Sequence, residues 1–357
     1  MMIRKYFSVS FILFIVLLFC GVGCANYRLV VEPYDRNQAL HETTVFTDDG
    51  ASKSSGDKVA MISYTGLIAM GRRPSLLGKG RNPVSDFVEA LEKARKDDRV
   101  KAIILSINSP GGTVTASDIM YQQVRRFKEK SKKPVVVLMG EVAASGGYYL
   151  SCAGDEIIAR PTTITGSIGV IIETINFSEG LAKIGIHARS VTSGPNKSMG
   201  SPFEPEKPEH RKIMQGMVDE FYARFVDIVK KNRPNLAQDD LPKATDGRVV
   251  TGHHALELGL VDAVGYLPDA FSAAKRLAHL DRARLVKYHR PGEFVPTAYA
   301  ESTVSADAKS LSSTGDSSGS VMNVNLLQFN AFNGMSGSMT PPVGPTAYYL
   351  WSSDIGE

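Results

Sequence analysis

Residues 102–112 read AIILSINSPGG and residues 135–149 read VVVLMGEVAASGGYY, and these two stretches decide the fold. Each begins with a mostly apolar run of the kind that forms strands buried in parallel sheets. Between them, residues 114–128 have the pattern of an amphipathic helix. A strand, a helix and a second strand in this order indicate a crossover unit, so the sequence predicts an α/β fold.

The same alternation continues on both sides of this unit. Residues 59–62 predict another buried strand, and apolar residues in 84–94 recur at helical spacing. Shorter helices are expected at 254–259 and 268–277. A long amphipathic helix, packed on the core or on a neighbouring subunit, is predicted from one apolar face: Ile213, Met217, Phe221, Phe225 and Val229.

Composition excludes some functions. The chain has 357 residues, of which 43% are hydrophobic and 22% charged, and its formal net charge is only +4. These values are ordinary for a globular protein, and no nucleic-acid-binding motif is present. The three cysteines, Cys20, Cys24 and Cys152, do not have metal-ligand spacing, so we expect neither a metal nor a cofactor.

The N-terminus predicts export. Arg4 and Lys5 precede a largely apolar run over residues 6–20, and small residues follow it. The residues before Cys24 resemble the lipobox of bacterial lipoproteins, except that Gly21 stands where leucine is usual. Cys24 would then be lipidated; an uncleaved signal anchor and plain secretion are the alternatives. All three place the rest of the chain outside the cytoplasm.

Composition also predicts the domain boundaries. Residues 1–23 would be the signal peptide or signal anchor, 24–57 a polar stalk, and 58–287 the globular domain. Residues 288–320 are expected to form a Ser-rich linker. Residues 321–357 form an apolar tail rich in Pro and Tyr, and such dense aromatic residues are unusual in a disordered end.

Two glycine-containing turns follow the predicted strands. Gly111 and Gly112 leave backbone N–H groups uncovered just before a helix, which suits a developing oxyanion, although many Gly-Gly turns are only turns. Ser145 is surrounded by small residues, and Gly146 places an N–H directly after it. Ser145 is therefore a candidate nucleophile, and a simple helix cap is the alternative.

A serine nucleophile needs a base. None of the seven histidines lies in a small, glycine-bounded motif like that of the serine. Lys197 is the other candidate, because the residues from Ser193 to Pro202 contain no other charged side chain. A lysine acts as a base only as a neutral amine, although a loop lysine is ordinarily a solvated charge.

Six segments, in order, carry a family resemblance: Ser109–Gly112, Ala143–Tyr149, Thr165–Val170, Ser193–Pro202, Asp246–Val249 and Gly259–Asp262. With these segments, the chain resembles the signal peptide peptidase A family of bacterial serine peptidases over roughly residues 58–280. The resemblance implies that Ser145 is acylated, that Lys197 takes and returns the proton, and that Ser167 orients the lysine amine. Gly146, with Gly111 or Gly112, would form the oxyanion hole.

The resemblance also implies a fold and an assembly. The fold would be the spiral of ββα units shared by crotonases and the Clp protease. Single-unit members resemble proteins that form homo-oligomeric rings, in which the lysine can come from a neighbouring subunit. The implied activity is an endopeptidase that degrades signal peptides and other unfolded segments at the bacterial cell membrane, on its extracytoplasmic side.

Two other functions stay open at this point. A crotonase-type acyl-CoA hydratase or isomerase would share the fold and the paired N–H donors, but it would need a catalytic carboxylate. A non-catalytic, ring-forming scaffold is suggested by the Pro- and Tyr-rich end, which would dock on a partner or enter the chain's own site as a pseudo-substrate.

Overall fold

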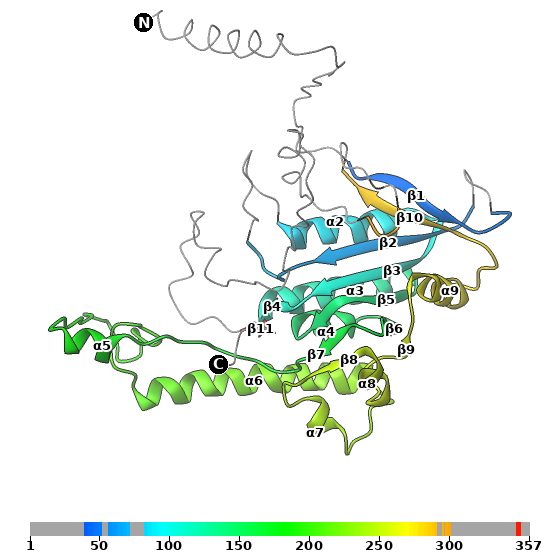
Figure 1. Ribbon diagram of the computed structural model, residues 1–357. Coiled ribbons are helices and arrows are strands. Elements are labelled where there is room, and N and C mark those ends of the chain that lie inside the picture. The colour runs from blue at the N-terminus through cyan, green and yellow to red at the C-terminus, as the bar shows by residue number, and fades with distance from the viewer. Residues whose placement is uncertain are drawn as a thin grey trace, which may run out of the picture. The chain divides into compact units, whose positions relative to one another are not determined.

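The computed structural model describes residues 39–51, 56–71, 82–290, 295, 297–300 and 348–350 (Figure 1). The predicted signal segment and Cys24 lie outside these ranges. The strands are β1 His41–Thr47, β2 Lys58–Thr65, β3 Val100–Ser109, β4 Gly111–Thr113, β5 Val135–Ala144, β6 Glu156–Ala159, β7 Ile164–Gly166, β8 Val249–Thr251, β9 Ala263–Val264, β10 Arg284–His289 and β11 Tyr348–Leu350. The helices are α2 Pro83–Lys96, α3 Val114–Ser131, α4 Gly146–Ser151, α5 Ser178–Lys183, α6 Pro208–Asn232, α7 Leu241–Ala244, α8 Gly252–Glu257 and α9 Leu267–Leu277.

Within the described residues, the main sheet has nine strands and is mostly parallel. Its order is β1-β10-β2-β3-β5-β6-β9, and β7 pairs with the end of β5 and with β8. β1 runs antiparallel to β10, and β8 runs antiparallel to β7. The crossover unit predicted from residues 102–149 is β3, α3 and β5, and its two strands pair in parallel. The α/β prediction is confirmed; the ββα spiral stays a prediction.

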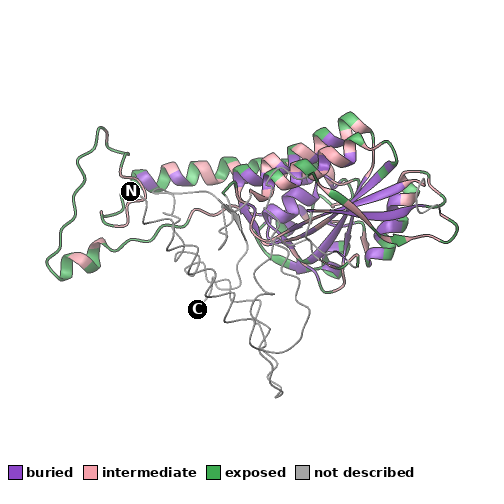
Figure 2. Cartoon of the chain, turned by 90° about the horizontal axis from the view of Figure 1, so that it is seen from above, coloured by how far each residue is buried: buried purple, intermediate pink, exposed green. Residues whose placement is uncertain are grey.

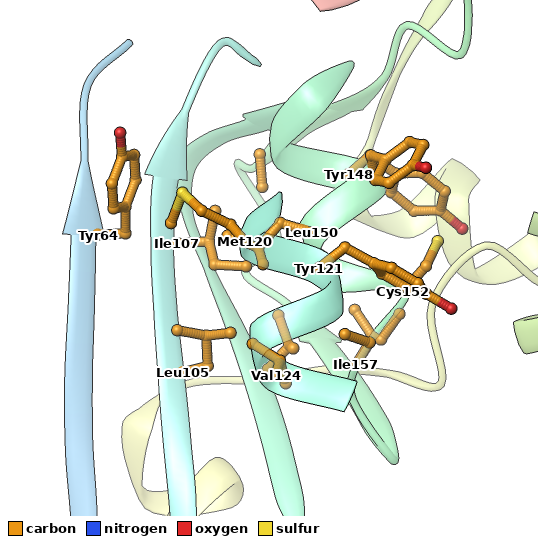
Figure 3. Packing of buried hydrophobic residues seen from close by; sticks show 14 of the residues in the cluster. Tyr64, Leu105, Ile107, Met120, Tyr121, Val124, Tyr148, Leu150, Cys152 and Ile157 are labelled. Carbon is orange, nitrogen blue, oxygen red and sulfur yellow. The ribbon is translucent and has the colours of Figure 1, made fainter. Parts of the chain in front are cut away.

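Alternation along the strands divides the core between two faces of the sheet. Ile103, Leu105 and Ile107 of β3 face the cluster that includes α2, α3 and α4, whereas Ala102 and Ile104 face the cluster that includes α9. Figure 3 shows the first cluster, in which the β3 side chains lie against those of α3. Because parallel strands are covered on both faces, they read as continuous apolar runs in the sequence.

The described part of the chain departs from the predicted domain boundaries at both ends. β1 lies inside the segment predicted to be a polar stalk, and the compact unit begins at Ala39 rather than at residue 58. At the other end, His289 still belongs to β10, beyond the predicted end of the domain at residue 287. β1 is an edge strand with no fully buried residue, so its sequence is polar enough to resemble a stalk.

Ion pairs hold this edge strand to the domain. The Lys58 ammonium group, at the start of β2, bonds carboxylate oxygens of Glu42 and Asp97 at 2.7 Å each. Lys58 is almost fully buried, so its charge requires these two partners. Glu42 of β1 is therefore part of the structure of the domain. Among the described residues, none of the helices combines the length and apolar content needed to span a membrane.

Candidate active site

Ser145 occupies a strained turn between a strand and a helix. β5 ends at Ala144 and α4 begins at Gly146, so Ser145 is the single residue between them. Its φ of 52° and ψ of −117° are unusual for any residue with a Cβ. The turn is also tightly packed, since a Cβ on Gly147 would lie 2.7 Å from the backbone oxygen of Ser109. Backbone strain of this kind is concentrated at functional sites.

The Ser145 hydroxyl has no structural task in the described part of the chain. The residue is 1% exposed, and its Oγ has no hydrogen-bond partner there. It does not cap α4, although it stands at the N-cap position. Leaving a buried hydroxyl unsatisfied costs about 1–3 kcal/mol, so its presence needs another explanation. The alternative that Ser145 is a helix cap therefore finds no support in the geometry.

The Gly-Gly turn lies directly beside Ser145. A Cβ on Gly146 would sit 3.2 Å from the Gly112 nitrogen and 3.2 Å from the Gly111 Cα. The Gly111 N–H donates to the Ser109 Oγ at 3.1 Å, so this amide is already engaged. The Gly146 amide and the amide of Gly112, the residue opposite Tyr349 of β11, therefore lie close together, one from each turn. Two adjacent N–H groups of this kind suit a developing oxyanion.

Sequence reasoning missed two residues that hold this turn. The Ser109 side chain is fully buried and bonds the Gly111 backbone. Ile68 pairs with β4 through its backbone. Its N–H donates to the Gly111 oxygen at 2.7 Å, and its carbonyl oxygen accepts from the Thr113 N–H at 2.9 Å. The position of Ser109 directly before Pro110-Gly111-Gly112 could have indicated that its hydroxyl bonds the turn. Ile68 lies in a loop, and its pairing to β4 had no signal.

We expect Gly146→Ala to reduce turnover sharply, because the new methyl group would sit 2.4 Å from the Ser117 Oγ and would push the two glycine turns apart. Alanine keeps the backbone N–H but moves it, and the complete loss of one oxyanion donor, which lowers kcat by roughly 10²–10³, sets the upper limit of the effect. Steady-state kinetics on a peptide substrate measures the effect, and thermal unfolding reports any loss of stability. Gly216→Ala is the matched control, since a Cβ there meets nothing within 4 Å. Equal kcat values for the two variants would contradict this assignment.

The structure brings Ser167 close to Ser145. β7 is parallel to the end of β5 with Ala144 opposite Gly166, so each serine follows one member of a register pair. The Ser145 N–H donates to the Gly166 oxygen at 2.8 Å. Adjacent strands are about 4.8 Å apart, so the two serines are neighbours at the carboxyl ends of β5 and β7. Ser167 also has a positive φ, of 49°, and is 7% exposed.

Lys197 is not joined to Ser145 within this chain. It lies in a segment that we call the arm (residues 171–206), which includes α5 and is largely exposed in Figure 2. Its side chain is exposed, and in the described part of the chain its ammonium group makes no hydrogen bond or ion pair. The arm is held to the start of α6, where the His210 ring bonds the Pro195 oxygen at 3.1 Å. The single chain thus presents serine and lysine separately.

Cys152 is not a competing nucleophile. Its side chain is fully buried behind α4, and burial raises the pKa of its thiol to about 12. A thiol reacts as its thiolate, which is scarce at neutral pH when the pKa is so high. Cys152 follows the last residue of α4, whereas Ser145 directly precedes the first, beside the glycine turns.

An α/β fold that presents a strained serine between glycine amides is typical of serine hydrolases that form an acyl-enzyme. The chain belongs to peptidase family S49, whose pattern matches residues 127–281, and it is a serine-type peptidase. It is 35% identical over 255 residues to the protein named "Putative signal peptide peptidase SppA" of Enterococcus faecium, covering 71% of this chain and 72% of that one. This family membership confirms the resemblance found in the sequence motifs.

Two further relatives agree. The chain is 39% identical over 228 residues to "Putative protease slr0021" of Synechocystis, covering 64% of this chain and 77% of the relative. It is 37% identical over 223 residues to "Protease 4" of Haemophilus influenzae, covering 62% of this chain but only 35% of the longer relative. Membership in a peptidase family argues against both alternatives, the acyl-CoA hydratase or isomerase and the non-catalytic scaffold.

Proposed function

We propose that this chain is an extracytoplasmic Ser–Lys endopeptidase that degrades cleaved signal peptides and other unfolded segments at the membrane. The observation that carries the proposal is the Ser145 hydroxyl, which is buried and unpartnered in the described chain, in a strained turn beside the Gly112 and Gly146 amides. Its proximity to Ser167 supports the family's expected division of roles. We also propose that its α/β fold is the spiral of ββα units shared by crotonases and the Clp protease.

The reaction would proceed by acyl transfer. The Ser145 Oγ attacks the peptide carbonyl carbon, and its proton passes to the neutral amine of Lys197. The Gly112 and Gly146 N–H groups stabilise the carbonyl oxygen as it becomes negative. Lys197 then protonates the departing amine. Water, deprotonated by the same lysine, releases the acyl group, and Ser167 holds the lysine amine in place.

A second copy of the chain would supply Lys197. The arm that carries this lysine exposes several large apolar side chains: Ile175, Phe177, Ile184, Ile186, Val191 and Phe203. Exposed apolar surface gathered on one segment marks an interaction site. Packing of the arm on a neighbouring subunit would bury these side chains and bring Lys197 to that subunit's Ser145. Repetition of this contact around an axis gives a homo-oligomeric ring.

The N-terminal segment would tether the ring to the membrane, through a lipid on Cys24 or through an uncleaved anchor. Signal peptides are apolar and become extended when they leave the bilayer. An extended peptide can bind by adding a strand to an exposed edge, which needs backbone groups rather than a charged pocket. β4 is suited to this role because it carries Gly112.

We expect hydrolysis of an unfolded apolar peptide to accelerate as pH rises from neutrality to about 9, because a lysine base must be in its neutral form and that form becomes more abundant as pH rises. The pH dependence of kcat/KM for a synthetic signal peptide in detergent tests this, with product masses giving the cleavage sites. A folded protein carrying the same sequence in a buried strand is the control. A rate that is flat or falls over this range would contradict a lysine base.

A further inference from the structure

The backbone turn that carries Lys197 is not held by packing within the chain. Residues 169–209 are all described, and none of them is buried. His210, the third residue of α6, is the next buried residue and is 4% exposed. Segments with few buried apolar contacts open easily, so the place of this turn depends on hydrogen bonds.

Two backbone hydrogen bonds shape the turn locally. The Lys197 N–H donates to the Gly194 oxygen at 3.2 Å, and the Met199 N–H donates to the Asn196 oxygen at 3.2 Å. These bonds join residues that are three apart in the sequence. They give the backbone around the lysine its shape, but they do not attach it to the rest of the domain.

The His210 ring attaches the turn to α6. Its Nε2 lies 3.1 Å from the oxygen of Pro195, two residues before the lysine. A carbonyl oxygen can only accept, so Nε2 carries the hydrogen and donates it. The exposed Lys207 amine reaches the same oxygen at a longer 3.3 Å. Figure 1 shows α6 running from the arm back to the body of the domain, where Phe225 and Val229 are fully buried in the core.

Glu204 holds the other side of the turn. Its carboxylate accepts the Ser190 N–H at 2.6 Å, and the side chains of Ser190 and Ser198 also bond it. These hydrogen bonds lower the pKa of the Glu204 carboxyl, so the acceptor is ionised at neutral pH. Ser198 directly follows the lysine. The turn is therefore attached on both sides of Lys197.

We propose that His210 is a positioning residue for Lys197, with Glu204 as the second attachment of the same turn. The inference rests on the proposed function in taking Lys197 as the base. A general base must come within about 2.6–3.2 Å of the group whose proton it takes, and a displacement of about 1 Å can lower the rate 10²-fold. His210 acts here through the lysine turn and needs no contact with the substrate.

Two substitutions at one position test the role of the ring N–H. His210→Leu fills similar space without a donor, whereas His210→Gln keeps an N–H donor on a side chain of similar reach. We expect His210→Leu to lower kcat for a peptide about 10–100-fold with KM unchanged, and His210→Gln to retain most of kcat. Lys212→Leu, at an exposed position of α6, is the control and should behave like the parent. Amide hydrogen exchange in residues 194–201 should accelerate only in His210→Leu.

Mixed oligomers give a readout that a general loss of structure would not reproduce. In these oligomers, a Ser145→Ala chain supplies the lysine and a Lys197→Ala chain supplies the serine. Adding His210→Leu to the lysine-supplying chain should lower the recovered activity about tenfold, whereas adding it to the serine-supplying chain should leave that activity unchanged.

Two results would overturn the positioning role: equal losses from the two mixed oligomers, or equal kcat values for His210→Leu and His210→Gln. Failure of the proposed function is seen separately. Parental activity in Lys197→Ala alone would refute the lysine base, whatever the His210 variants do.

Discussion

Replacing Ser145 by alanine is expected to abolish peptide hydrolysis while leaving the fold intact. Removing the nucleophile of a serine peptidase lowers turnover by roughly 10³-fold or more. Stability should not fall, because the Ser145 Oγ has no hydrogen-bond partner in the described structure and the change removes an unsatisfied buried hydroxyl. Peptide hydrolysis followed by mass spectrometry measures the loss, and thermal unfolding measures stability.

Ser151→Ala provides the matched control. Ser151 is also fully buried and is the last residue of α4, the helix that follows Ser145, but its hydroxyl donates to the Gly147 oxygen at 2.8 Å. Its removal should lower stability by about 1 kcal/mol and leave most of the activity. Comparison of the two variants therefore separates an effect on catalysis from an effect on stability. If Ser145→Ala kept substantial activity, Ser145 would not be the nucleophile.

Lys197→Ala is expected to have an effect of similar size, because an unassisted serine hydroxyl is a poor nucleophile. The side chain is exposed and makes no hydrogen bond or ion pair in the described chain, so its removal should leave the fold intact. Lys183→Ala, an exposed lysine of α5 in the same arm, is the control and should retain parental activity. Steady-state kinetics of both variants at pH 8 to 9 makes the comparison. Parental activity in Lys197→Ala would exclude this lysine as the base.

Mixing two inactive variants tests whether the lysine crosses between subunits. If the Lys197→Ala chain supplies the serine and the Ser145→Ala chain supplies the lysine, co-assembled rings regain intact sites. Random assembly in a head-to-tail ring makes about a quarter of the sites intact. Activity near that fraction, after joint unfolding and refolding, is the expected result. Failure to recover any activity in mixed oligomers of confirmed composition would place both residues of the dyad on one chain.

The fold was predictable where burial is complete. The apolar runs that form β2, β3 and β5 are visible in the sequence, because parallel strands covered on both faces leave few positions for polar residues. β1 was missed because it is an edge strand with only partly buried residues. β11 was missed because its place depends on pairing with β4, and strand partners distant in the sequence have no local pattern.

The candidate site was predictable to a similar extent. Small residues around Ser145 and paired glycines indicated a turn open to a substrate backbone. The family resemblance named Ser167 as a site residue, and the Ala144–Gly166 register of β5 and β7 gives the physical reason why it lies beside Ser145. The choice of Gly112 over Gly111 required the bond between the Gly111 N–H and the Ser109 Oγ. The sequence named Lys197 but could not predict its distance from Ser145. In the structure the lysine lies in the exposed arm and does not contact the serine hydroxyl within the described chain.

Reaction with a serine-directed probe tests the central claim most directly. The intact protein, incubated with a small fluorophosphonate at pH 8 to 9, should gain the mass of one probe per chain, and peptide mapping should locate it on Ser145. Labelling should be lost in Ser145→Ala and strongly slowed in Lys197→Ala, with both variants folded by thermal unfolding. The same spectrum reports whether the chain begins at Cys24. A folded, peptide-cleaving protein that takes no probe, or takes it on another residue, would contradict the account.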